Sequence, residues 1–569
     1  MRSPPERWPD AGAALRDCAF LAALVVLSVV LYVHQLGFYS DDWAFLGSLT
    51  ASGEGSLGGL FRSIHSPHVA MRPVQLLYMA GLFRLFGPDP LGYHLVQSGM
   101  LVSLAVLGYL ALRELRQARL IALSLPAVYV LLPHYASNRF WFATFMITLS
   151  MVLYLASLYA QSRAVRGGTG AFWTWMAGAV LALWLSALAY ELTIPLFLLN
   201  AWLVAQFGEW RRAGSLRSRL ARMLAVQLTA LVPVLVYKAA TTTRMVGEGG
   251  LLDLWRGIAG QAVRLDYGPT DYGLNLEAAL RVAFLEYGLG LPRILWTILR
   301  EEPHAAILSG GQGVALAVFV YLVRAPDAPP LEQRRGFWLR FIALGVLVFG
   351  LGYAIFLTNM NVQFTTSGIA NRTAMAAAFG VAVVFVGVAG LAGSLRTSIR
   401  ARRLAFGAIV GLLCGTGFVI NNTLASFWVE AYRRERAILA QLDARFPTLP
   451  SDSILILDGI CPYEGPVPVF ESSWDLAGVL LMRHDDYSLR ADVVTRRMDV
   501  GEDGLTTHIY GSMRQDYPYG ERLIVYDVAT DTARSLPDAR AARAYFAGRL
   551  PRLEGDCPRG HEGHGVQVF

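Results

Sequence analysis

Two adjacent acids stand directly after the first long apolar run of the chain. Asp41 and Asp42 lie in Gly37-Phe-Tyr-Ser-Asp-Asp-Trp-Ala-Phe45, bracketed by Tyr39 and Trp43. Neighbouring carboxylates at a membrane surface are costly to desolvate and repel each other. A solvated loop that stops the apolar run is the simpler interpretation, but the flanking aromatic residues favour a site at headgroup depth. A carboxylate placed there could accept a proton from a hydroxyl group.

Three arginines and one further acid lie near the expected outer ends of other apolar runs. Arg72, Arg139 and Arg372 are candidates for binding a phosphate, because the planar guanidinium stays charged in a low dielectric and contacts phosphate with two N–H groups. Snorkelling of these side chains to the interface is the alternative. Glu191 could pair with Arg139 or Arg372, orient a substrate, or cap the helix that follows it.

Several histidines and the single lysine complete the set of candidate polar groups. His65, His68 and His134 could contact a phosphate or orient the acids, as could His94, and Lys238 is a second possible phosphate cation. His65 and His68 are three residues apart and could also ligate a divalent metal, but no third ligand is fixed by spacing. We therefore predict no metal and no other cofactor.

The composition indicates the elements that must position these groups. Of 569 residues, 54% are hydrophobic and only 16% are charged, and the mean hydropathy is +0.43. A soluble globular chain carries about 25% charge. The net charge of +7 comes almost wholly from arginines in short loops between apolar runs, which argues against a nucleic-acid surface. The chain is therefore expected to be a polytopic α-helical membrane protein.

About 20 mainly apolar residues are needed to span a bilayer, and eleven runs approach this length. The expected spans are 18–36, 93–112, 120–134, 141–161, 171–189, 192–208, 222–240, 304–323, 338–357, 374–393 and 404–422. A signal peptide is the alternative for the first run, but no A-x-A-like cleavage site follows it.

Arginine placement predicts the orientation of the spans. Basic loops follow every even-numbered span, and the N-terminus is basic as well. Cytoplasmic loops are enriched in Lys and Arg, so the N-terminus is expected in the cytoplasm and residues 423–569 outside the inner membrane, in the periplasm of a Gram-negative cell.

The chain is expected to have two parts, a membrane module (1–428) and an extracytoplasmic α/β domain (429–569). Long outer loops at 37–92 and 241–303 contain segments, 60–86 and 276–300, that resemble amphipathic interfacial helices. The elements expected in the second part are a charged helix at 429–446, strands at 453–458, 491–495 and 522–528, and a helix at 538–548. Cys461 and Cys557 would share its oxidising compartment, so we expect them to form a disulfide.

This arrangement resembles the GT-C superfamily of polyprenyl-phosphate-sugar glycosyltransferases, which includes protein O-mannosyltransferases, lipid A aminoarabinose transferases and mycobacterial arabinofuranosyltransferases. The resemblance covers the whole architecture and, in residues, mainly 37–97 and 134–160. It rests on an acidic pair in the first outer loop, on His68-Val-Ala-Met-Arg-Pro73 and on Phe86-Gly-Pro-Asp-Pro-Leu-Gly-Tyr-His94 before the second span.

The resemblance implies a membrane hexosyl- or pentosyltransferase that moves a sugar from a polyprenyl phosphate to a hydroxyl of a cell-envelope glycan, lipid or protein, with inversion. Asp41 matches the family's base, with Asp42 as the fallback. Arg139 resembles an arginine that the mannosyltransferases carry in their second outer loop, and Arg372 precedes span ten, where the family commonly binds the donor phosphate.

Two other classes compete with this interpretation. A transporter of lipid-linked glycans would be expected to show inverted repeats and ionisable or helix-breaking positions at mid-membrane, and we find no repeat. An O-antigen polymerase or ligase would rely on arginines in long outer loops, and the early Asp41-Asp42 pair argues against it.

The predicted orientation can be tested with reporters. A reporter that works only in the periplasm should be active when it is fused after Phe569, and a reporter that works only in the cytoplasm should be inactive there. The reason is that eleven spans place the two termini on opposite sides of the membrane. Strong activity of a cytoplasmic reporter at the same position would contradict both the span count and the location of the acidic pair.

Overall fold

The structure is a computed structural model, and it describes most of the chain. The described residues are 11–53, 56–63, 70–211, 214–246, 269–301, 304–325, 331, 335–358, 362–495, 498–509 and 513–549.

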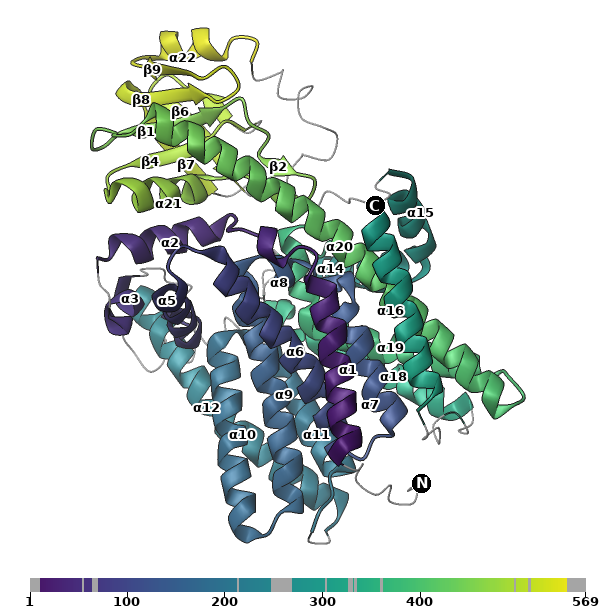
Figure 1. The fold of residues 1–569 in the computed structure, drawn as a ribbon. Coiled ribbons are helices and arrows are strands. Elements are labelled where there is room, and N and C mark those ends of the chain that lie inside the picture. The colour runs from purple at the N-terminus through teal and green to yellow at the C-terminus, as the bar shows by residue number, and fades with distance from the viewer. Residues whose placement is uncertain are drawn as a thin grey trace.

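Nine helices within these ranges are long and apolar enough to cross a membrane. They form the lower part of the molecule in Figure 1. These helices are α1 (Ala11–Val29), α6 (Pro90–Glu114), α9 (Phe145–Arg166), α10 (Thr169–Ala189), α12 (Leu216–Val246), α16 (Ala305–Val323), α18 (Arg335–Tyr353), α19 (Met375–Ser394) and α20 (Ile399–Arg445). Nine of the eleven expected spans are found in them.

The other two expected spans form shorter helices. The run 120–134 gives α7 (Arg119–Leu131), and 192–208 gives η4 (Glu191–Leu196) followed by α11 (Phe197–Phe207). Every residue of α7 from Leu120 to Leu131 is buried. A helix enclosed by protein in this way does not have to match the thickness of the bilayer, because its ends need not reach water. Both helices have nearly the expected bounds, but they are shorter than the about 20 residues that cross a bilayer.

Short helices cap one end of the bundle, as expected for 60–86 and 276–300. The first outer segment forms α2 (Asp41–Ala51), α3 (Leu57–Ser63) and α5 (Pro73–Phe86). The second forms α14 (Pro269–Leu280), the π-helix η5 (Arg281–Leu289) and α15 (Leu291–Glu301), with a bend of 64° before α15. The remaining short elements are η1 (Val33–Gln35), η2 (Pro133–Tyr135), α8 (Ser137–Phe140), η3 (Phe142–Thr144), η6 (Ala354–Thr358) and η7 (Ile369–Ala374).

The C-terminal part is an α/β domain at the same end of the bundle (Figure 1). Its main sheet has the order β4-β1-β8-β9, in which β1 pairs in parallel with β4 and β8. A three-stranded antiparallel sheet, β5-β6-β7, and a β2-β3 pair complete it. The elements are β1 (Ile454–Asp458), β2 (Tyr463–Glu464), β3 (Val467–Pro468), α21 (Ser473–His484), β4 (Arg490–Val493), β5 (Met498–Val500), β6 (Gly504–Ile509), β7 (Met513–Pro518), β8 (Gly520–Asp527), β9 (Thr532–Leu536) and α22 (Ala539–Phe546).

The three expected strands and the late helix are confirmed as β1, β4, β8 and α22. The charged helix expected at 429–446 is also present, but it continues the last span as one 47-residue helix, α20. No glycine or proline occurs between 423 and 428 to interrupt it. The fold class predicted from the sequence, a polytopic helical membrane protein with a C-terminal α/β domain, is confirmed.

The domain is joined to the bundle by a continuous core. The largest hydrophobic cluster includes Leu46 of α2 together with Leu476 and Val479 of α21, and α21 lies directly over α2 in Figure 1. Cys461 is disulfide-bonded. Cys557 lies outside the described residues, so the pairing of the two cysteines stays a prediction.

Candidate functional site

The two acids of the first outer loop begin α2 but have different surroundings. Acidic residues favour a helix N-terminus because they complement its dipole. Asp42 is fully buried, and its carboxylate accepts hydrogen bonds from the backbone N–H of Tyr39 (2.9 Å) and of Ala143 (2.7 Å). Burial raises its pKa well above the ordinary value, although these backbone donors favour the charged form. Asp42 therefore ties the segment between α1 and α6 to the segment between α7 and α9.

Asp41 faces a cation instead of backbone donors. Burial raises the pKa of Asp41, while the guanidinium of Arg372 and the indole of Trp474 partly offset this by favouring the charged carboxylate. Of the two acids, Asp41 is therefore the one that interacts with side chains, Arg372 and Trp474, that could also bind a substrate.

Three features of the structure fix the position of Arg372: the backbone before it, a hydrogen bond and a contact with an aromatic ring. It lies in η7, which follows Gly368; this glycine has a φ of 77°, and a Cβ there would come within 3.0 Å of the Pro466 carbonyl oxygen. The Arg372 Nη1 atom donates to the Ile369 carbonyl (2.8 Å), and its guanidinium lies 5.1 Å from the centre of the Trp141 ring. These contacts fix the guanidinium whose charge lowers the pKa of Asp41.

Arg139 is enclosed by the bundle. It is only 3% exposed, and its guanidinium lies 5.9 Å from the centre of the Tyr135 ring. Its Nη1 atom is 3.5 Å from the Ser28 hydroxyl of α1, and its Nε and Nη2 atoms make no hydrogen bond in the described residues. A phosphate contact for Arg139 stays a prediction.

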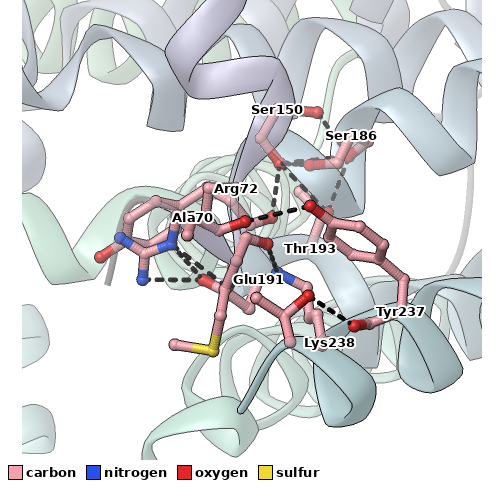
Figure 2. Close-up of polar contacts among 11 residues, drawn as sticks. Ala70, Arg72, Ser150, Ser186, Glu191, Thr193, Tyr237 and Lys238 are labelled. Carbon is pink, nitrogen blue, oxygen red and sulfur yellow. Dashed lines mark hydrogen bonds and ion pairs between the residues drawn. The ribbon is translucent and has the colours of Figure 1, made fainter. Parts of the chain in front are cut away.

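A second charged cluster joins α5, η4 and α12 (Figure 2). Arg72, which precedes Pro73 at the start of α5, contacts Glu191 through Nε and Nη2 at 3.0 and 2.9 Å. The ammonium of Lys238 lies 2.6 Å from the other oxygen of Glu191. Burial raises the pKa of Glu191, but the two cations outweigh it and hold that pKa at about 2. Glu191 therefore pairs with Arg72 and Lys238, and pairing with Arg139 or Arg372, as the sequence allowed, is not found.

Hydroxyl groups support the backbone beside this cluster. Ser150 of α9, Ser186 of α10 and Thr193 of η4 hydrogen-bond one another at 2.8–3.2 Å, and Figure 2 places them next to Glu191. The side chain of Tyr190 lies under Arg72, with the guanidinium 4.1 Å from the ring centre. The turn that carries Glu191 is thereby fixed to two long helices.

The histidines have structural contacts or fall outside the described residues. His134 is buried, and its Nε2 atom lies 3.0 Å from the Ala283 carbonyl of η5. His94 makes a similar 2.9 Å contact with the Gly37 carbonyl. His65 and His68 lie outside the described residues. Within the part of the chain that the structure describes, no group of three His, Cys, Asp or Glu residues could hold a metal ion.

The C-terminal domain contributes residues that the sequence did not assign. Glu471 precedes α21, and Trp474 is in its first turn; both influence Asp41 or the residues beside it. Ser472 and Asp475 have the spacing of a helix start, which could have predicted α21. No local signal shows that α21 packs on α2, because that contact joins segments more than 400 residues apart.

Comparisons with known proteins give limited information. No family model matches the chain, and no curated protein matches it. Two solved structures of ArnT from Cupriavidus metallidurans resemble it in fold. The structure bound to undecaprenyl phosphate has a TM-score of 0.38 and 14% identity, over 84% of this chain and 85% of ArnT. The apo structure has a TM-score of 0.36 and 16% identity, over 81% and 85%. A similarity of this size assigns neither a reaction nor a residue role to this chain.

The charged cluster around Glu191 predicts a stability effect. Removing one partner of a buried ion pair costs about 3–5 kcal/mol; because the Glu191 side chain is 21% exposed, we expect Glu191→Gln to cost about 1–3 kcal/mol. Thermal unfolding in detergent measures this loss. Glu277→Gln, at an exposed position of α14, is the matched control. The double variant Glu191→Gln with Lys238→Met should recover part of the loss, since it removes one of the two repelling cations. An unchanged unfolding temperature in Glu191→Gln would contradict the prediction.

Proposed function

We propose that the protein is an inverting glycosyltransferase of the outer face of a bacterial inner membrane. It moves a hexose or pentose from a polyprenyl-phosphate donor to a hydroxyl of a glycan, lipid or protein acceptor. The observation that carries this proposal is the difference between the two acids. The Asp42 carboxyl group accepts hydrogen bonds from two backbone N–H groups, whereas the charge of the Arg372 guanidinium favours the ionised form of Asp41.

The proposed reaction needs one base and one phosphate-binding cation. The acceptor oxygen attacks the anomeric carbon, the bond from that carbon to the phosphate oxygen breaks, and the hydroxyl proton passes to the Asp41 carboxylate. The departing polyprenyl phosphate is stable as an anion, so no general acid has to protonate it, in contrast to the two-carboxylate sites of glycosidases. Arg372 would bind this phosphate through its planar fork. A single displacement of this kind inverts the anomeric carbon.

The second cluster supplies further cations for the donor. Arg72 and Lys238 are separated by one carboxylate, Glu191, so the cluster as a whole carries one net positive charge. We assign to Arg72 a contact with the donor headgroup, and to Glu191 the role of holding both cations in position. Contacts of Arg139 and His134 with the donor remain part of the proposal, as do contacts of His65 and His68, which lie outside the described residues.

The competing classes differ from this proposal in their substrates. A transporter and a polymerase or ligase would transfer no sugar from a polyprenyl monophosphate. Incubation of the purified protein with a labelled polyprenyl-phosphate sugar and envelope extracts therefore tests the class of reaction directly. Release of free polyprenyl phosphate together with a labelled product supports the transferase.

The two acids should respond differently to substitution. Asp41→Asn preserves shape and removes basicity, so it should lower transfer by about 10²–10⁴-fold while donor binding is retained. Asp42→Asn should lower the unfolding temperature, because an amide replaces a carboxylate that accepts two backbone hydrogen bonds. Transfer assays, donor titrations and thermal unfolding of both variants measure this difference between loss of transfer and loss of stability. Wild-type rates in both single variants and in the double variant would show that this mechanism is wrong.

The charge of Arg372 should set the pH dependence of transfer. The guanidinium favours ionised Asp41 and so lowers its pKa. Removing that charge in Arg372→Met should raise the pKa and move the acid limb of kcat/KM to higher pH. Arg372→Lys keeps the charge, so its acid limb should stay near that of the wild type while its rate falls, because the bidentate fork is lost. If the acid limbs of Arg372→Met and the wild type are identical, the charge of Arg372 does not influence the ionisation of Asp41.

A further inference from the structure

The C-terminal domain places a buried carboxyl group against the loop that carries Asp41. Glu471 is 6% exposed. Its Oε1 atom accepts a hydrogen bond from the Ser40 hydroxyl (2.8 Å), and its Oε2 atom accepts one from the Tyr463 hydroxyl. Ser40 immediately precedes Asp41 in the chain. The domain therefore holds the residue next to the proposed base.

We propose that Glu471 is a positioning residue of the transfer site, and that the C-terminal domain is consequently a required half of this site. The inference rests on the proposed function and deepens it. Glu471 acts through Ser40 and is not assigned a contact with the reacting atoms.

The backbone at Ser40 requires such support. Ser40 has a φ of 48°, a region that residues with a side chain rarely adopt. Strained residues of this kind persist only where the surrounding structure holds them. The hydrogen bond to Glu471 is one restraint on Ser40, and the hydrogen bond from Tyr39 N–H to Asp42 fixes the chain on either side of it.

Close packing of two helices fixes the domain on the bundle. A Cβ at Gly47 of α2 would lie 2.4 Å from the Gly478 carbonyl oxygen, and a Cβ at Gly478 of α21 would lie 2.4 Å from the Trp43 carbonyl oxygen. A side chain at either glycine would force the helices apart. Because Glu471 lies just before α21, this contact determines where its carboxyl group stands relative to Ser40.

The charges around Glu471 link it to the proposed base. The charged groups that influence it are Asp41, which disfavours its ionised form, and Arg372, which favours it; on its own domain, Tyr463 and Asp475 are the titratable neighbours. Asp41 and Glu471 thus share one guanidinium. Burial raises the pKa of the Glu471 carboxyl group, and the charge of Asp41 raises it further. Glu471 therefore acts on Asp41 through its hydrogen bond with Ser40 and not through a charge of its own.

Two substitutions separate the charge of Glu471 from its hydrogen bonds. Glu471→Gln keeps an oxygen that can accept the hydrogen bond from Ser40, so kcat should stay within a few fold of the wild type and the acid limb of kcat/KM should stay in place. Glu471→Ala removes this oxygen and should lower kcat by about 10–100-fold, the scale of a misplaced catalytic group. Asp492→Asn is the control: Asp492 is an equally buried acid of the same domain that bonds Thr507 and Tyr517.

Hydrogen exchange gives a readout that does not depend on the reaction. Amide exchange of residues 40–51, measured by mass spectrometry on the full-length protein, should increase in Glu471→Ala and in Gly478→Val and stay unchanged in Asp492→Asn. Unchanged exchange and a wild-type kcat in Glu471→Ala, or an equal loss of kcat in Glu471→Gln and Glu471→Ala, in a protein that transfers sugar, would overturn this inference alone. If the wild type transfers no sugar while Glu471→Ala still loosens residues 40–51, the proposed function fails and only the docking role of Glu471 survives.

Discussion

The carboxylate of Asp42 is the constraint on which the rest of the site depends. A buried carboxylate must have its oxygens hydrogen-bonded, or its desolvation cost is not offset. Asp42 meets this requirement with the backbone N–H groups of Tyr39 and Ala143, and so joins the first and second outer loops. Because the start of α2 is fixed in this way, the preceding residue, Asp41, is held where the charge of Arg372 favours its ionised form.

Charges near the membrane surface are arranged in local groups that leave one cation partly unneutralised. Glu191 stands between Arg72 and Lys238, and Arg372 is the cation nearest to Asp41. Coulomb interactions are strong in the low dielectric of such sites, so a phosphate arriving at the Glu191 group, which has two cations and one carboxylate, would be bound without the cations having to be brought together. The C-terminal domain adds its own carboxyl group, Glu471, to the second of these groups.

The sequence predicted local features well and long-range contacts poorly. Nine spans, the interfacial helices and three strands follow from hydrophobic periodicity, and Asp41 and Arg372, both predicted as site residues, are brought together. The shortness of α7 was visible in the sequence, but its complete enclosure by other helices was not, because it depends on contacts between distant segments. The partners of Glu191 and the place of Glu471 depend on contacts between distant segments, and no local pattern encodes them.

The central claim is that Asp41 faces the anomeric carbon of a polyprenyl-phosphate sugar whose phosphate is bound by Arg372. An experimental structure of the protein with a non-transferable donor analogue tests it most directly. The account predicts the phosphate on the Arg372 guanidinium and the Asp41 carboxylate on the opposite side of the anomeric carbon, with room for an acceptor oxygen about 3–3.5 Å from that carbon. A donor bound with its anomeric carbon remote from Asp41 would contradict the account.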